Sequence, residues 1–156
     1  MSTLKKTALV IGLTLAATTV MAQPAKSQKH ANKATEWRQG VFQLLASNMG
    51  PLGAMAKGKI PVDKAVVEKN AMRINQLSLM ITDYLATDTR KFKVKTEALD
   101  KVWTDPALLN KKANALTLAS ANLQKVVISG DDKAIKQAIG GIGKTCGGCH
   151  DDFKKD

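Results

Sequence analysis

The stretch DDKAIKQAIGGIGKTCGGCHDDF, residues 131–153, decides the fold class of this chain. Its apolar residues and cysteines recur every three or four positions, which is the spacing of one face of an α-helix. The residues on that face are Ile135, Ile139, Ile142, Cys146, Cys149, His150 and Phe153. Asp131 or Asp132 can cap the helix at its start. We therefore predict a final helix that turns both cysteines and His150 toward a core.

Three earlier segments show the same apolar period, so the sequence predicts an all-α, antiparallel up-down four-helix bundle. The first helix should span about 33–55 and the second about 61–86. The third should span about 105–129, with Asp105 as its cap. Pro51 has no backbone N–H, so we expect a kink or a break in the first helix at that residue.

Two segments of the chain lack this periodicity. The polar residues 23–32 are predicted to form a mobile lead-in. Residues 87–104 are the longest irregular stretch, and a loop of that length inside a compact domain usually carries a function. Phe92, Leu99 and Trp103 should fasten the loop to the body of the protein. No segment shows a strand pattern.

The N-terminus is predicted to be a cleaved secretory signal peptide, residues 1–22. Lys5 and Lys6 precede an uncharged apolar run over 7–20, which is too short to span a bilayer. The alternative, a single membrane anchor, lacks a stop-transfer pattern. The mature domain would then be 23–156, in an oxidising compartment outside the cytoplasm. Processing would lower the formal net charge from +11 to +9.

The last helix contains the motif Cys146-Gly147-Gly148-Cys149-His150, which is the C-x-x-C-H signature of covalent c-type haem attachment. Cysteines three residues apart on a helix face the same side, so both sulfurs can bond the vinyl groups of one porphyrin. The histidine that follows can ligate the iron. A haem would also fill core space in a chain with only 4% aromatic residues.

Three other interpretations of the two cysteines are weaker. A thioredoxin-like pair is expected after an early strand, in a mixed α/β context. A zinc site needs a fourth ligand, and His30 in the lead-in is the only other histidine. A structural disulfide would close a very small loop and would leave His150 unexplained.

With the motif at the end of four helices, the sequence resembles the cytochrome c′ family of class II c-type cytochromes. The resemblance covers essentially all of the mature chain. It rests on residues 146–150, on Arg-Gln-Gly-Val-Phe at 38–42 and on Thr-Glu-Ala-Leu-Asp-Lys-Val-Trp at 96–103. It implies a four-helix bundle with one covalent haem c, usually a homodimer in the bacterial periplasm.

The resemblance also implies roles for individual residues. Cys146 and Cys149 would form the thioethers and His150 would be the axial iron ligand. Arg38 and Gln39 would lie near the haem propionates, and Thr96 and Glu97 would touch the haem edge. The family often has arginine four residues after the histidine; this chain has Lys154, a point charge without the planar donor set of arginine.

In the family, the residue four positions after the arginine faces the open side of the iron, and here it is Phe42. Phenylalanine has no donor atom, so we expect five-coordinate, high-spin iron. Such iron can bind nitric oxide, and carbon monoxide more weakly, limited by the bulk of the ring. The alternative is a six-coordinate electron-transfer cytochrome with a Met/His ligand pair. Its methionine candidates are Met49, Met55, Met72 and Met80.

Two functional classes fit the sequence, and two others are disfavoured. The first is a gas-binding haem protein, and the second is an electron carrier that a basic surface steers toward an acidic redox partner. An enzyme such as a peroxidase is disfavoured, because no distal histidine, arginine or carboxylate is placed for it. Nucleic-acid binding is disfavoured as well, because the lysines are scattered along the helices without a basic and aromatic motif.

Overall fold

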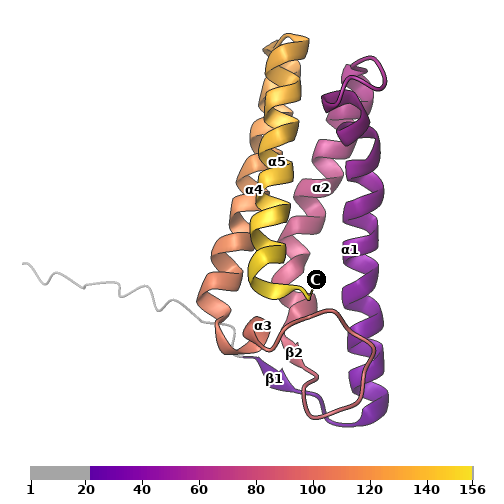
Figure 1. Cartoon of the computed structure of the whole chain (residues 1–156), viewed down its shortest axis with the longest axis vertical. Helices are drawn as coiled ribbons and strands as arrows, with labels where there is room; N and C mark the ends of the chain where they lie inside the picture. Colours follow the sequence, from indigo (N-terminus) through magenta and orange to yellow (C-terminus); the bar gives the residue numbers. More distant parts are fainter. Residues whose placement is uncertain (1–21, 156) are drawn as a thin grey trace, which may run out of the picture.

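Four long helices run alternately up and down along one axis, as the computed structural model of residues 22–155 shows (Figure 1). They are α1 (Gln28–Ala56), α2 (Lys64–Leu85), α4 (Pro106–Ser129) and α5 (Asp132–Phe153), and a single turn, α3 (Lys101–Thr104), precedes α4. The predicted all-α, antiparallel four-helix bundle is confirmed. The proposed signal peptide, residues 1–22, lies outside the described residues except for Ala22.

Aspartates set the start of three of these helices. Each side chain accepts a hydrogen bond from the backbone N–H three residues later, which satisfies a donor that has no partner within the helix. The pairs are Asp63 with Val66, Asp105 with Leu108 and Asp131 with Ala134. Gly58, in the turn between α1 and α2, has a φ of 70°, a conformation that glycine adopts without steric cost.

Residues 23–32 are part of the fold, so the prediction of a mobile lead-in is wrong. β1 (Gln23–Pro24) pairs in parallel with β2 (Thr87–Asp88), which also corrects the expectation of no strand. Ala25 and Ala31 are buried, and the Ser27 side chain caps α1. Sequence periodicity could not detect this pairing, because two-residue strands are too short to show alternation.

Helix α1 continues through Pro51, so the expected break does not occur. Proline inside a helix removes one hydrogen bond and costs about 3 kcal/mol. Buried side chains on both sides of it, among them Leu45, Leu52 and Met55, anchor the two halves of α1 in the same core. Tertiary packing therefore offsets the local cost.

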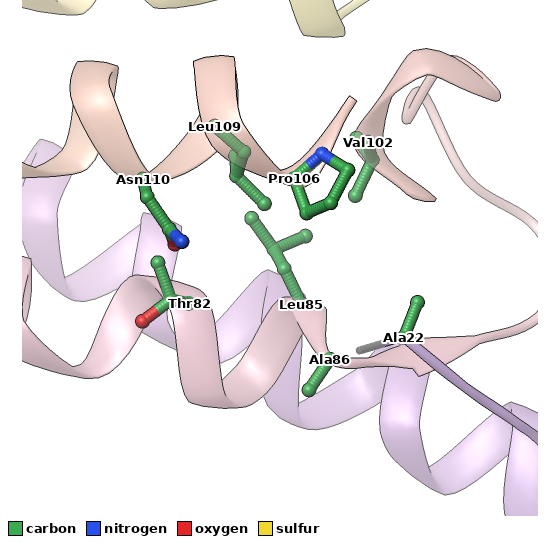
Figure 2. A pocket seen from close by; sticks show the side chains of 8 residues that line it. All are labelled: Ala22, Thr82, Leu85, Ala86, Val102, Pro106, Leu109 and Asn110. Atoms are coloured by element: carbon green, nitrogen blue, oxygen red, sulfur yellow. The ribbon is translucent and has the colours of Figure 1, made fainter. Parts of the chain in front are cut away.

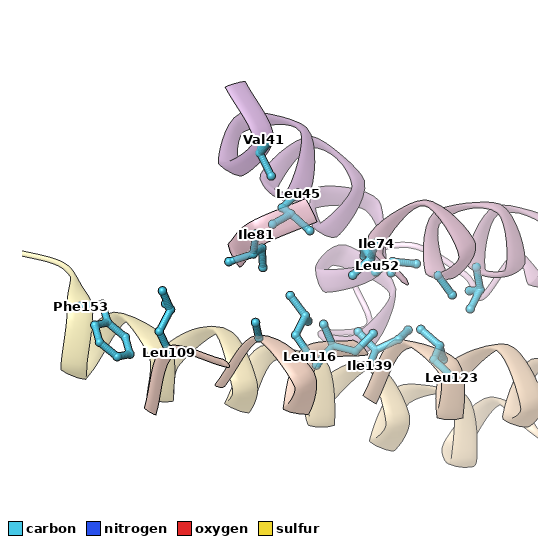
Figure 3. Close-up of a cluster of buried hydrophobic side chains, with 14 of the residues drawn as sticks. Val41, Leu45, Leu52, Ile74, Ile81, Leu109, Leu116, Leu123, Ile139 and Phe153 are labelled. Carbon is cyan, nitrogen blue, oxygen red and sulfur yellow. The ribbon is translucent and has the colours of Figure 1, made fainter. Parts of the chain in front are cut away.

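The core is a continuous set of aliphatic side chains from all four helices (Figure 3). Leu52, Ile74, Leu123 and Ile139 are among its most deeply buried members. Helix α2 packs extensively against α1 and α4, and α4 packs against α5, whereas α1 and α5 make the smallest contact of the neighbouring pairs. None of the helices within residues 22–155 has the length and hydropathy needed to cross a membrane.

Candidate functional site

The C-x-x-C-H motif occupies the final turns of α5, at the end of the bundle where α1 and α4 begin (Figure 1). Cys146 and Cys149 are not joined by a disulfide, and both lie half-buried against the apolar core. His150 is exposed, so only part of the prediction holds: the cysteines lie against the core and the imidazole does not. His150 lies about 100° around the helix from Cys149, which places it at the edge of the apolar face.

Burial raises the pKa of both thiols, and for Cys149 the nearby Lys112 opposes that effect. A raised pKa keeps a thiol protonated at neutral pH and makes it a poor nucleophile, unlike the cysteines of redox enzymes. The described strands, β1 and β2, have two residues each and lie far before Cys146 in the sequence, whereas a thioredoxin-like pair is expected after a strand in a mixed α/β context. Within residues 22–155, no three His, Cys, Asp or Glu side chains converge to hold a metal ion.

Two lysines hold the C-terminal turn of α5 against the elements beside it. Lys112 Nζ of α4 donates to the carbonyl oxygen of Gly148 at 2.6 Å and pairs with Asp152 Oδ2 at 2.8 Å. Lys101 Nζ of α3 pairs with Asp152 Oδ1 at 2.5 Å. The two ammonium groups, Lys101 first, lower the pKa of Asp152 to about 2. The backbone between the two cysteines is therefore fixed by α4, and the turn after it by α3 and α4.

Arg38 of α1 is almost fully buried, at 3% exposure. Its Nη2 donates to Thr35 Oγ1 at 3.0 Å and to Thr89 Oγ1 at 3.4 Å, and its guanidinium carbon lies 5.2 Å from the centroid of the Trp103 ring. Burial lowers the pKa of this side chain. Its Nη1 is the one buried side-chain polar atom without a hydrogen-bond partner among the described residues.

An unpaired N–H on a buried cation is costly, and a carboxylate ligand would relieve that cost. Haem carries two propionate carboxylates that could serve as this ligand. The donor set therefore fits haem c: two half-buried cysteines, an accessible imidazole and a buried guanidinium with a free N–H. Trp103 and Lys101, both on α3, connect the surroundings of Arg38 to the end of α5.

The loop after β2 reaches from α1 to the end of α5. Gln39 Nε2 donates to the carbonyl oxygen of Lys95 at 2.9 Å, and the backbone N–H of Lys155 donates to the carbonyl oxygen of Glu97 at 2.8 Å. Thr96 Oγ1 accepts a hydrogen bond from the backbone N–H of Ala98. Thr96 and Glu97 therefore lie on the segment of the loop that joins α1 to the end of α5.

Phe42 lies four residues after Arg38, on the same side of α1, and is 37% exposed. The candidate methionine ligands are spread over other parts of the bundle. Met55 is buried near the far end of α1, and Met72, 50% exposed, lies in the first half of α2, also toward that far end. Met49 packs partly buried against the core, and Met80 lines a hollow between α1 and α2.

Two hollows on the described surface lie away from α5. The one in Figure 2 lies between the end of α2, α3 and the start of α4, and its volume of about 20 Å³ has room for one water molecule. The other, about 390 Å³, is lined by His30, Ala34, Trp37, Met80, Asp83, Tyr84 and Thr87. Neither contains a residue of the C-x-x-C-H motif.

Lys112, Asp152 and Trp103 contribute to the site in ways that sequence reasoning missed. Trp103 was expected only to fasten the loop, which it does by donating from Nε1 to the carbonyl oxygens of Leu85 and Thr87. The contact of Trp103 with Arg38 and the ion pair of Lys112 with Asp152 each connect two elements that are distant in the sequence. No local sequence pattern could therefore indicate these contacts.

Comparison with known proteins agrees with this description. The family described as cytochrome c′ matches residues 33–154. Cytochrome c′ of Rubrivivax gelatinosus is 37% identical over 122 residues, which cover 78% of this chain and 94% of that protein. The structure of cytochrome c′ from Shewanella frigidimarina has a TM-score of 0.73 and 40% identity, covering 81% and 97% of the two chains. A ferrous variant of Alcaligenes xylosoxidans cytochrome c′ with bound NO has a TM-score of 0.71 and 27% identity, covering 81% and 96%.

Proposed function

Because the chain belongs to the cytochrome c′ family and carries haem c, we propose that it is a periplasmic protein with five-coordinate, high-spin iron that binds nitric oxide. Carbon monoxide is a weaker ligand. The role is binding and electron transfer, with no enzymatic turnover. Haem c supplies a redox-active iron with an open coordination position. The side chains around that position determine which ligands can bind the iron.

Each residue at this end of the bundle has a proposed role. Cys146 and Cys149 bond the haem through thioethers and His150 ligates the iron. Arg38 receives a propionate on its free Nη1, which is the unpaired buried donor in the structure. Gln39, Thr96 and Glu97 lie along the haem edge, where Gln39 also holds the loop through the Lys95 carbonyl.

The observation that carries the five-coordinate state is Phe42, one helical turn beyond Arg38 on the same side of α1. Its ring has no atom that can ligate iron and no donor that can stabilise polarised dioxygen. The positions of Met55 and Met72, toward the far end of the bundle, support the same assignment. Nitric oxide bound to a ferrous relative at 27% identity is consistent with this function.

Visible absorption spectra of the purified protein, oxidised and reduced, test this proposal. We expect a high-spin ferrous Soret band that shifts when nitric oxide is added. A low-spin spectrum with a sharp alpha band, unchanged by the gas, would contradict it and favour Met/His ligation. Phe42→Ala should increase carbon monoxide affinity, and His150→Ala should abolish the axial ligation.

We further propose that the protein is a homodimer formed through the outer face of α1 and α2. Trp37 is 55% exposed and Leu44, seven residues later on the same face of α1, is 54% exposed. Trp37 lines the 390 Å³ hollow together with Met80 and Tyr84 of α2, so an apolar side chain from a second copy has a place to insert. Trp37→Glu should convert the dimer to a monomer in sedimentation equilibrium, whereas Leu118→Glu, on α4, should not.

A further inference from the structure

Three lysines project from the loop between β2 and α3 at alternate positions. Lys91, Lys93 and Lys95 are exposed, and Phe92 and Val94 between them are half-buried. None of the three lysines forms an ion pair within residues 22–155, whereas the neighbouring Arg90 is paired with Asp88. We call Lys91, Lys93 and Lys95 the lysine strip.

The backbone of the lysine strip is held in place by α1. Gln28 Nε2 donates to the carbonyl oxygen of Lys93 at 2.9 Å, and Gln39 Nε2 donates to the carbonyl oxygen of Lys95 at the same distance. The backbone N–H of Phe92 donates to the carbonyl oxygen of Thr89 at 3.0 Å. The backbone that bears the three lysines is therefore already ordered, which reduces the entropy lost when a partner binds.

The strip lies close to the C-terminal turn of α5. Ala98 forms an antiparallel bridge with Lys154, four residues after His150. Lys95 precedes Ala98 by three residues, so the two backbone positions are at most about 10 Å apart. A ligand at the Lys95 end of the strip would therefore lie beside the end of the helix that contains the C-x-x-C-H motif.

The charge around the strip is positive overall. Lys154 and Lys155 are exposed at the end of α5 and add to it. The exposed carboxylates nearby are Glu97, Asp100 and Asp151. Asp152 is already neutralised by Lys101 and Lys112. Among residues 22–155 this surface therefore presents five exposed lysines against three exposed carboxylates, and this excess of positive charge attracts an anionic partner.

We propose that the lysine strip is the docking surface for an acidic redox protein that exchanges one electron with the haem. This inference rests on the proposed function only in requiring a redox-active haem beside the strip. In the oxidative direction, ferrous iron becomes ferric and the metal centre of the partner is reduced by one electron. No bond forms or breaks. The lysines hold the acidic surface near the haem and accelerate the encounter.

The first test measures oxidation of the ferrous protein by hexacyanoferrate(III), a small anionic acceptor that becomes hexacyanoferrate(II). The test variant is Lys91→Gln, Lys93→Gln and Lys95→Gln combined. The matched control combines Lys57→Gln, Lys59→Gln and Lys133→Gln, three exposed lysines at the opposite end of the bundle. Both variants lose three positive charges. A difference between their oxidation rates is therefore due only to where those charges lie.

An ionic strength of about 0.1 M gives a screening length of about 10 Å, whereas the 29 residues of α1 extend roughly 44 Å. We therefore expect the second-order rate to fall about tenfold in the strip variant and less than twofold in the control. Equal rates in the two variants would overturn the proposal. The spectra recorded with nitric oxide test the coordination of the iron independently of these rates. If the iron proves to be six-coordinate, the ratio of oxidation rates between the two variants still tests the lysine strip.

The second test identifies the class of partner by binding rather than by electron transfer. A polyglutamate peptide of about 20 residues should shift the amide NMR signals of residues 90–98 in the native protein and not in the strip variant. Vesicles of phosphatidylglycerol and phosphatidylcholine provide the other anionic surface. Strip-dependent binding to the vesicles with no response to the peptide would assign the strip to a membrane and overturn the proposal.

Discussion

The two ends of this bundle are built from different kinds of contact. At the turn end, where α1 joins α2 and α4 joins α5, buried aliphatic residues such as Leu52 lie below aspartate caps. At the haem end, which contains the C-x-x-C-H motif and the loop after β2, Arg38 is buried and Lys112 and Asp152 join two helices.

The difference shows where the protein gives up stability for function. The turn end buries mainly apolar side chains, and its buried amides, Asn48 and Asn70, donate to carbonyl oxygens one turn back in their own helices. The haem end keeps a buried cation with an unpaired N–H, an arrangement that proteins retain mainly at functional sites. Substitutions at the two ends should therefore separate stability from ligand binding.

The largest expected effect is at the turn end. Leu52→Ala removes a fully buried side chain and should lower the free energy of unfolding by about 2–5 kcal/mol, measured by urea denaturation. Leu118→Ala, at a position that is 63% exposed, should change it by less than about 0.5 kcal/mol. The nitric oxide spectrum should be the same in both variants. A spectral change in Leu52→Ala would mean that the two ends are coupled.

Substitution of Arg38 should act on the haem-loaded protein and not on the haem-free one. Arg38→Met removes the propionate partner, so the loaded protein should lose about 1–3 kcal/mol of unfolding free energy. The haem-free form, prepared with Cys146→Ser and Cys149→Ser, should be unchanged or more stable, because the variant removes a buried cation with a free N–H. Equal losses in both forms would show that Arg38 is only a structural residue.

A smaller effect is expected from the lysine that contacts the motif. Lys112→Met removes the hydrogen bond to Gly148 and the ion pair with Asp152. Amide hydrogen exchange over residues 146–153 should become faster, because α4 no longer holds that turn. Lys111→Met, at the neighbouring exposed position, provides the control and should leave exchange unchanged. Equal exchange in the two variants would contradict the role of Lys112.

The smallest effect is a pH dependence at the strand pair. The side-chain hydrogen bond from Arg90 lowers the pKa of Asp88 from its ordinary value of 3.8, so the folded state favours the carboxylate. Stability from this pair is present above that value and is lost as the pH falls below it. Asp88→Asn should flatten the acid side of the stability curve in thermal unfolding. Adding Arg90→Gln should produce no further change.

Much of the turn end could be predicted from the sequence. Asp131 is one of the two residues predicted to cap the last helix, and capping is predictable because it depends on residues within one turn. The buried positions Ile135, Ile139 and Ile142 follow from periodicity alone. Of the kink or break expected at Pro51, the break does not occur, because packing of the whole helix outweighs one lost hydrogen bond.

The haem end was only partly predictable. The motif identifies the cysteines and His150 because covalent attachment requires that spacing. It could not show that His150 is exposed, or that residues 23–24 pair with residues 87–88 across more than 60 positions of sequence. Those features depend on how distant segments meet.

The sequence by itself determined the four helices, the caps of the last two and the haem-attachment motif, because each depends on residues a few positions apart. Only the tertiary structure decided that Arg38 has a free buried N–H, that Lys112 contacts the motif and that three lysines stand beside it. These are contacts between separate elements. Packing of the helices, rather than any local spacing, sets their distances.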